Sequence, residues 1–136
     1  MKSIAFLSIL ALAIILFSAC GKEYSNEGGR KYTSIGTLKT DSGDCLLSRV
    51  NGSFVKGQSV NDSNYIDVEV IVTRIGSYLL ISDKNNNIQF KGEGIFIAPG
   101  EHIVRLTATG IPQADGRYPF TINYGKDHCN MSIQVY

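Results

Sequence analysis

Residues 65–74 read YIDVEVIVTR, and this stretch decides the fold class. Every second side chain in it is apolar: Ile66, Val68, Val70 and Val72. The positions between them are mainly polar, and Ile71 is the exception. A repeat of two residues is the period of a β-strand with one buried and one solvated face. β-branched side chains also favour extended backbone. The stretch therefore predicts an amphipathic strand.

The same signal recurs along the rest of the chain. Further strands are expected near Cys45 and over residues 78–82, 88–98, 104–108, 120–124 and 131–135. Asn, Asp, Gly and Pro separate them, as is typical of turns. Gly92 and Gly94 are expected to mark a bulge or bend inside one strand. About seven antiparallel strands predict an all-β fold, an immunoglobulin-like β-sandwich, although the chain lacks the buried Trp of antibody domains.

The N-terminus carries the features of a secretory signal. Lys2 gives a basic start, and residues 4–17 are apolar apart from Ser8. A membrane-spanning helix needs about 20 apolar residues, so this run is too short to span. It fits the hydrophobic region of a signal peptide, and we expect residues 1–19 to be removed.

The end of the apolar run predicts a lipid-modified protein. Phe17-Ser18-Ala19-Cys20 resembles the lipobox of bacterial lipoproteins, although Leu is commoner where Phe17 stands. The resemblance implies cleavage before Cys20 and acylation of its thiol, with palmitate-type chains as the membrane anchor. Gly21 replaces the Asp that retains such proteins in the inner membrane. This favours the outer membrane of a Gram-negative bacterium, with the domain facing the surface or the periplasm. An ordinary secretory signal with an incidental cysteine is the alternative.

Residues 20–42 are expected to form a lipidated polar tether. They show no sustained apolar period, so they cannot bury enough apolar surface to offset the entropy lost on ordering. Such a stretch is typical of a flexible spacer. Residues 31–38 are a candidate for a short edge strand. The β-sandwich domain is then expected over residues 43–136.

The balance of charge excludes two classes of partner. The chain has 13 Lys and Arg against 12 Asp and Glu, which is a formal net charge of +1. Nucleic-acid binding requires a basic face, and electrostatic binding to membranes requires a polybasic patch. Neither is expected here, so the bilayer is expected as a partner through acylated Cys20.

Two cysteines remain once Cys20 is assigned to the lipid. Cys45 lies in the first expected strand and Cys129 at the start of the last, and these strands are often neighbours in a sandwich. An even pair in an oxidising compartment predicts a disulfide. Two free thiols are the alternative.

Apolar, glycine and cysteine positions follow one another in a set order between Cys45 and Val135: Cys45, Val50–Phe54, Gly57, Val70–Thr73, Gly76–Tyr78, Phe90, Gly94–Phe96, Gly100, Val104–Leu106, Gly110–Pro112, Gly116, Phe120, Cys129 and Ile133–Val135. This order resembles a short immunoglobulin-like repeat of secreted and surface proteins of Gram-negative bacteria. The resemblance implies the fold and a surface address, and no activity. The repeat usually occurs in tandem, whereas this chain has one copy, which argues against a purely architectural stalk.

No catalytic or metal-binding motif is apparent in the sequence. His102 and His128 lie beside polar turn residues and outside motifs such as HExxH. Residues 83–87, DKNNN, lack the glycine and distal glutamate of a calcium loop. His128 precedes Cys129, as in a nucleophile pair, but a disulfide would remove that thiol and no third group orients the base. We therefore expect no enzyme activity, no cofactor and no metal.

The expected function is that of a non-catalytic binding or adhesion module at the cell envelope, with an unidentified protein or glycan as partner. Sandwiches often bind through loops at one end. The candidate contact residues lie in three polar stretches: Asn61, Asp62, Asn64, Asp83, Asn85, Asn86, Gln113, Asp115 and Arg117. A structural or accessory subunit of an outer-membrane assembly is the alternative, and a small hydrolase is disfavoured.

Overall fold

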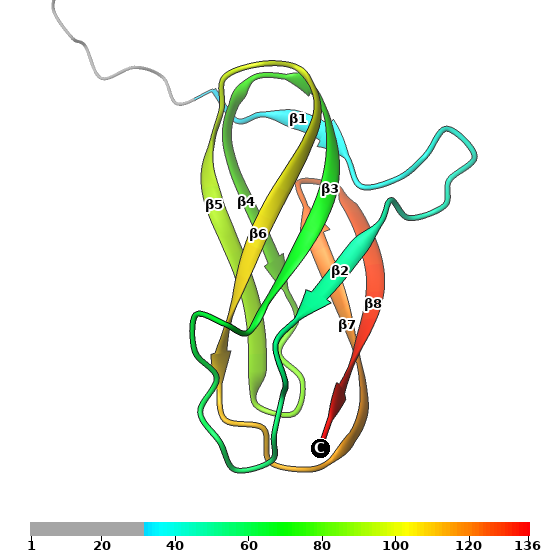
Figure 1. Ribbon diagram of the computed structural model, residues 1–136. Helices are drawn as coiled ribbons and strands as arrows, with labels where there is room; N and C mark the ends of the chain where they lie inside the picture. The colour runs from blue at the N-terminus through cyan, green and yellow to red at the C-terminus, as the bar shows by residue number, and fades with distance from the viewer. Residues whose placement is uncertain (1–31) are drawn as a thin grey trace, which may run out of the picture. The chain divides into compact units, whose positions relative to one another are not determined.

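The computed structural model describes residues 32–136. The expected signal peptide (residues 1–19), the lipid site Cys20 and the first part of the expected tether lie outside the described residues. The described part of the chain is all-β and contains eight strands: β1 Ile35–Thr37, β2 Ser48–Asn51, β3 Tyr65–Arg74, β4 Gly76–Ser82, β5 Ile88–Phe96, β6 Gly100–Gly110, β7 Gly116–Tyr124 and β8 Asp127–Val135 (Figure 1).

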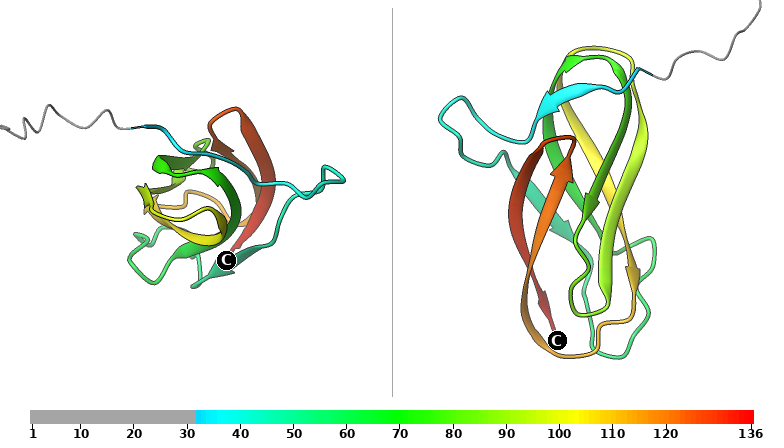
Figure 2. Two further views of the ribbon diagram at one scale, coloured as in Figure 1. Left: turned by 90° about the horizontal axis from the view of Figure 1, so that it is seen from above. Right: turned by 180° about the vertical axis from the view of Figure 1, so that it is seen from behind.

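The strands form an antiparallel ladder in the order β1-β3-β6-β5-β4-β7-β8, and β2 pairs with β3 next to β1. The series β3–β6–β5 and β4–β7–β8 follow the B–E–D and C–F–G orders of the immunoglobulin-like sandwich. Hydrogen bonds between β4 and β5 join the two halves. Seen along the strands, the ladder curls around a common interior (Figure 2). The all-β sandwich class is therefore confirmed, with eight strands instead of about seven.

The core explains why the alternating stretch decides the fold. In β3 the four apolar side chains predicted to share one face are all buried. Two of them meet equally buried partners on β6: Ile66 pairs with Leu106, and Val68 with Val104. Burying such side chains stabilises the fold by about 1.5–3 kcal/mol each. The two strands therefore fix their register through a shared apolar face.

The domain begins earlier than the sequence pattern indicates. Residues 35–37 form β1, so the edge strand considered for residues 31–38 is confirmed. Leu38 is only 1% exposed, and the buried Ser34 hydroxyl shares a 2.7 Å hydrogen bond with the Tyr124 hydroxyl. Residues 32–42 thus belong to the domain, and the boundary expected at residue 43 is corrected. A few apolar side chains in a polar run, without a sustained period, are too weak a signal to show this.

The two glycines of β5 do not mark a bulge. Tyr78 pairs with Gly94 and Leu80 with Gly92 in unbroken register. A Cβ atom at Gly94 would lie 2.7 Å from the Tyr78 hydroxyl oxygen, and one at Gly92 would lie 2.6 Å from the carbonyl oxygen of Arg105. The glycines are therefore needed for close approach of a ring and of a neighbouring strand.

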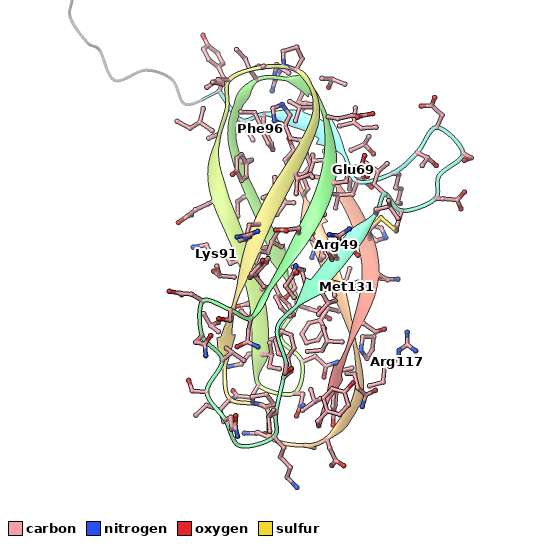
Figure 3. The ribbon with its side chains drawn as sticks, in the orientation of Figure 1. Arg49, Glu69, Lys91, Phe96, Arg117 and Met131 are labelled. Carbon is pink, nitrogen blue, oxygen red and sulfur yellow. A yellow bond between two sulfur atoms is a disulfide. The ribbon has the colours of Figure 1, made fainter. Side chains whose placement is uncertain are left out.

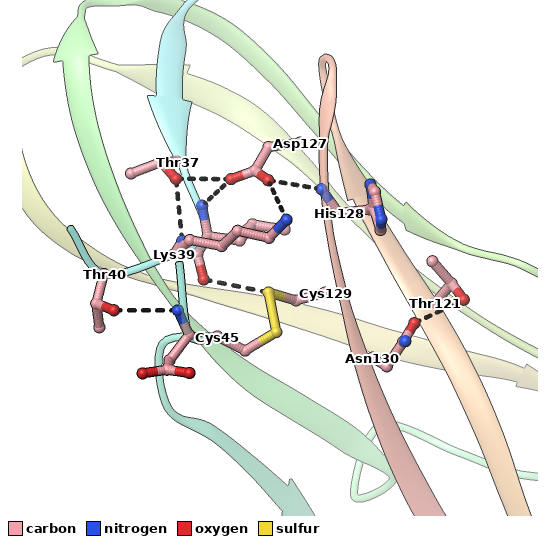
Figure 4. The surroundings of a disulfide bond; sticks show 11 residues. Thr37, Lys39, Thr40, Cys45, Thr121, Asp127, His128, Cys129 and Asn130 are labelled. Atoms are coloured by element: carbon pink, nitrogen blue, oxygen red, sulfur yellow. Dashed lines mark hydrogen bonds and ion pairs between the residues drawn. A yellow bond between two sulfur atoms is a disulfide. The ribbon is translucent and has the colours of Figure 1, made fainter. Parts of the chain in front are cut away.

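Cys45 and Cys129 form the predicted disulfide, with their Cα atoms 5.7 Å apart (Figure 4). Cys129 lies in β8, whereas Cys45 precedes β2 and bridges to Lys39, so its expected place inside a strand is corrected. The bond joins the segment before β2 to β8, on the opposite edge of the ladder. Near the other end of the same seam, Phe54 forms a parallel bridge with Val135. The two edges of the ladder are thus fastened at two points.

Asp127 ties the first strand to the start of β8. Its carboxylate accepts hydrogen bonds from the Thr37 hydroxyl (2.6 Å), the Leu38 N–H (2.7 Å) and the His128 N–H (2.9 Å) (Figure 4). The ammonium group of Lys39 lies 3.5 Å away. Partial burial favours the neutral acid, but the three hydrogen bonds and the nearby cation outweigh it and lower the pKa of Asp127.

This geometry predicts a pH-dependent contribution to stability. Because the pKa of Asp127 is lower in the folded chain, its contribution is fully present above about pH 4, the usual pKa of Asp, and is lost as the pH falls through the folded-state value. Asp127→Asn is expected to lower the free energy of unfolding by about 1–2 kcal/mol at neutral pH, with the difference vanishing in strong acid. Urea titrations over a pH series measure this. The exposed Asp62→Asn is the control, and a loss that persists in strong acid would contradict the assignment.

Candidate functional site

The three predicted loops meet at one end of the sandwich. The segment between β2 and β3, the β4–β5 loop and the β6–β7 loop lie together at the end away from residue 32, where the described chain begins (Figures 1 and 2). Antiparallel connectivity explains this, because β2, β4 and β6 all run toward that end. We call these segments, residues 52–64, 83–87 and 111–115, the loop end. Sequence reasoning proposed the loops one by one, and the fold brings them together.

The Asn86 amide group joins two of the loops. Its Oδ1 accepts hydrogen bonds from the N–H groups of Gln113 (3.1 Å) and Ala114 (3.0 Å), and its Nδ2 donates to the carbonyl of Ala114 (2.7 Å). Asn86 adopts a left-handed backbone, with φ of 46°. Asn tolerates this conformation better than most residues. The β4–β5 loop is therefore shaped around the β6–β7 loop.

Asn64 braces the third loop from within. It is only 5% exposed, its Oδ1 accepts from the Asn61 N–H (3.0 Å), and its Nδ2 donates to the carbonyl of Ser53 (2.8 Å). The N–H of Val60 donates to the carbonyl of Gly110 (3.1 Å), which links this loop to the end of β6. The loop end is thus a bonded platform instead of three independent loops.

The nine predicted contact residues fall into two groups. Four make internal bonds that occupy their side chains: Asn64, Asn85, Asn86 and Asp83, whose Oδ1 accepts from the Thr121 N–H. For these four, the structure shows a role in loop architecture, and the expected contact role stays a prediction. The other five are exposed, as Asp83 is: Asn61, Asp62, Gln113, Asp115 and Arg117. Among them, the Asn61 Oδ1 also accepts a hydrogen bond from the Ser63 N–H (2.8 Å). Arg117 lies in β7, where its Nε donates to the Ser132 hydroxyl (2.8 Å) (Figure 3).

The role of Asn86 can be measured directly. Asn86→Ala removes three hydrogen bonds. It also leaves an alanine at positive φ, which alanine adopts less readily than asparagine. We therefore expect a loss of about 2–3 kcal/mol in the free energy of unfolding. Asn86→Gly removes the same bonds but relieves the backbone cost, so it should lose about 1 kcal/mol less. Urea unfolding of both variants checks this. Equal losses would contradict the backbone contribution.

A second feature, which sequence reasoning missed, lies on the outer face of β2, β3 and β6. A hollow of about 350 Å³ is lined by Leu47, Ser48, Arg49, Asp67, Glu69 and Ile103. Figure 3 shows Arg49 and Glu69 on this face. Arg105 makes two bonds to Asp67 (2.9 and 3.2 Å), and this pairing raises the pKa of its guanidinium. Only the strand register could have revealed the hollow, since the register places its lining residues from β2, β3 and β6 side by side.

The histidines do not form a catalytic group with the cysteine. Cys129 is held in the disulfide, so it offers no thiol to the exposed His128. The His102 Nε2 lies 2.7 Å from the carbonyl oxygen of Ala98, and its ring packs 4.9 Å from that of Phe96. Within residues 32–136, no group of three or more His, Cys, Asp or Glu side chains is placed to hold a metal ion.

Residues 32–136 include no helix of the length and apolarity that crossing a membrane requires. Comparisons of the chain with models of protein families, with curated proteins and with solved structures gave no significant match. The arrangement of the loop end and the outer hollow is therefore the ground on which a function is proposed.

Proposed function

We propose that the protein is an outer-membrane lipoprotein, anchored through acylated Cys20, whose domain binds a protein or glycan through the loop end and carries out no catalysis. The lipobox-like Phe17-Ser18-Ala19-Cys20 supports the anchor. The likeness of residues 45–135 to an immunoglobulin-like repeat of surface proteins supports the address.

One observation carries the binding role. The loop end lies at the far end of the sandwich from residue 32, the side from which an N-terminal anchor would hold the domain (Figure 1). It is also rigid, because Asn86 bonds the β4–β5 loop to the β6–β7 loop, and the Gly57 N–H bonds the β2–β3 segment to the carbonyl of Pro112. Asp62, Gln113 and Asp115 remain exposed. Rigid loops with free polar side chains lose little entropy on binding. The geometry thus suits the display of a recognition surface away from a membrane.

A pair of matched variants tests this proposal. The loop variant Asp62→Ala/Gln113→Ala/Asp115→Ala removes two carboxylates and one amide from the loop end. The control variant Glu93→Ala/Gln134→Ala/Glu101→Ala removes the same groups from exposed sheet positions. Glycan arrays and envelope-protein binding screens should lose a signal with the loop variant only. Equal behaviour of the two variants toward every bound partner would remove the loop end from consideration.

Orientation decides which partners are screened. Protease treatment of intact cells, followed by detection of the domain with an antibody, is the measurement. Loss of the domain places it at the surface, where extracellular glycans and proteins are the partners. If the domain survives until the outer membrane is permeabilised, it faces the periplasm, and envelope complexes are then the partners to screen.

The outer hollow favours a second candidate, an accessory subunit of an outer-membrane assembly. Leu47 and Ile103 line it and are 80% and 75% exposed. Exposed apolar side chains ringed by charges are typical of protein contact sites. Leu47→Ser/Ile103→Ser should abolish co-purification with a larger complex if this candidate is correct, and should leave binding at the loop end unchanged.

A further inference from the structure

Exposed apolar side chains gather at the end of the sandwich opposite the loop end. Ile75 lies between β3 and β4, and Ile97 lies in the turn between β5 and β6. The β4–β5 register pairs Gly76 with Phe96, so its continuation by one residue sets Ile75 opposite Ile97. These two side chains are 48% and 85% exposed. Phe96, by contrast, is buried within the ladder (Figure 3).

Tyr32 and Ile95 extend this surface along β4. The N–H of Ser77 donates to the carbonyl of Tyr32 (2.8 Å), and Ser77 pairs with Ile95 across the ladder. Both side chains are about two-thirds exposed. We name Tyr32, Ile75, Ile95 and Ile97 the apolar end.

The position of the apolar end in the chain indicates what covers it. The described chain begins at Tyr32, and residues 21–31 separate it from Cys20. Eleven residues span at most about 40 Å in any conformation. If Cys20 is acylated, a bilayer therefore lies within reach of this end at all times. Such a short connection raises the effective concentration of the surface to the millimolar range, so even a weak contact is populated.

The charges near this end fit the same partner. Arg74 closes β3 and donates to the carbonyl of Thr33, and Lys126 lies in the β7–β8 turn. Asp127 is already occupied by Lys39, and Glu101 remains exposed at the start of β6. Arg74 adjoins Ile75, and Lys126 lines a hollow together with Arg74 and the exposed Ile35. Cations next to exposed apolar side chains match the boundary between anionic headgroups and acyl chains.

We propose that the apolar end rests on the lipid surface that holds the anchor, with Ile75, Ile97 and their neighbours dipping into the headgroup boundary. This inference rests on the lipid anchor of the proposed function. The contact of the apolar end with lipid is a second, non-covalent attachment of the domain to the membrane. This contact orients the loop end outward.

The absence of Trp from the sequence permits a clean test. Single-Trp variants of the full lipidated chain, Ile97→Trp and the matched Ile111→Trp at the loop end, are reconstituted in vesicles of phosphatidylethanolamine and phosphatidylglycerol with brominated acyl chains. Ile111 is 45% exposed. A side chain in the headgroup boundary lies close to the bromines, so quenching at position 97 should exceed that at position 111 by about threefold or more. Adding Ile75→Asp and Ile95→Asp to Ile97→Trp should abolish most of this difference.

Each outcome decides the matter. Equal quenching at both positions in anchored protein overturns the inference and leaves the anchor intact. Protection of position 97 from aqueous acrylamide without bromine quenching shows that protein covers the apolar end, and also overturns it. An unmodified Cys20 in the mass spectrum, with protein released from the vesicles, overturns the anchor and the inference together.

Discussion

Replacing the disulfide by Cys45→Ser/Cys129→Ala is expected to lower the free energy of unfolding by about 3–5 kcal/mol. The bond closes a long loop, because its cysteines have a sequence separation of 84, and a long loop loses much entropy when it is closed in the unfolded chain. It also fastens the segment before β2 to β8, which lies on the opposite edge of the ladder. Ala suits position 129 because Cys129 is buried, and Ser suits the exposed position 45.

Urea unfolding followed by circular dichroism measures the loss. Wild-type protein in reducing buffer is the control, because it lacks the bond but keeps both side chains. It should unfold close to the variant. A loss below about 1 kcal/mol for both would contradict the assignment of the bond as a main support of the fold.

Phe90→Ala is the second large effect, with an expected loss of about 3–5 kcal/mol. Phe90 is fully buried and lies edge-on between two rings, 5.9 Å from Phe54 and 5.1 Å from Phe120. Its ring therefore joins β5 to the segment after β2 and to β7, and its removal leaves a cavity bordered by these three segments. Such cavities collapse poorly, which increases the loss.

The control for this variant is Leu79→Ala, which removes an apolar side chain that is 46% exposed. We expect a loss below about 1 kcal/mol there. Urea unfolding of the two variants gives the comparison, provided that the free energy of unfolding falls with urea concentration at the same slope in both. Similar losses for both would mean that the aromatic cluster is not the centre of the core.

The sequence predicts the strands well because their signal is local. Between Ile66 and Val72 every second side chain is apolar in the sequence and buried in the fold. Cys129 lies near the start of the last strand, as expected. The loops differ, since the role of an asparagine depends on what lies across the fold. Asn86 bonds residues 27 and 28 positions away, and Asn64 bonds one 11 positions away. Side chains that looked free in sequence are for this reason part of the scaffold.

The start of the domain and the outer hollow escaped prediction for a related reason. Leu38 is buried because Asp127, far along the chain, accepts its N–H and holds β1 in place. The hollow exists because Asp67 of β3 lies opposite Arg49 of β2 and Arg105 of β6. The early start of the domain and the hollow both depend on strand register between distant segments. That register cannot be read from the local pattern of a single sequence.

The disulfide also decides how the domain would carry mechanical load. A pull between residue 32 and a ligand held at the loop end would act along the strands and shear their hydrogen bonds together. Residues 32–44 precede the bond and can lengthen first, by at most about 45 Å. At Cys45 the tension divides between β2 and β8, which run side by side toward the loops. Under such a load, the segment before Cys45 would extend first, and the rest of the domain would then be held through two strands, β2 and β8.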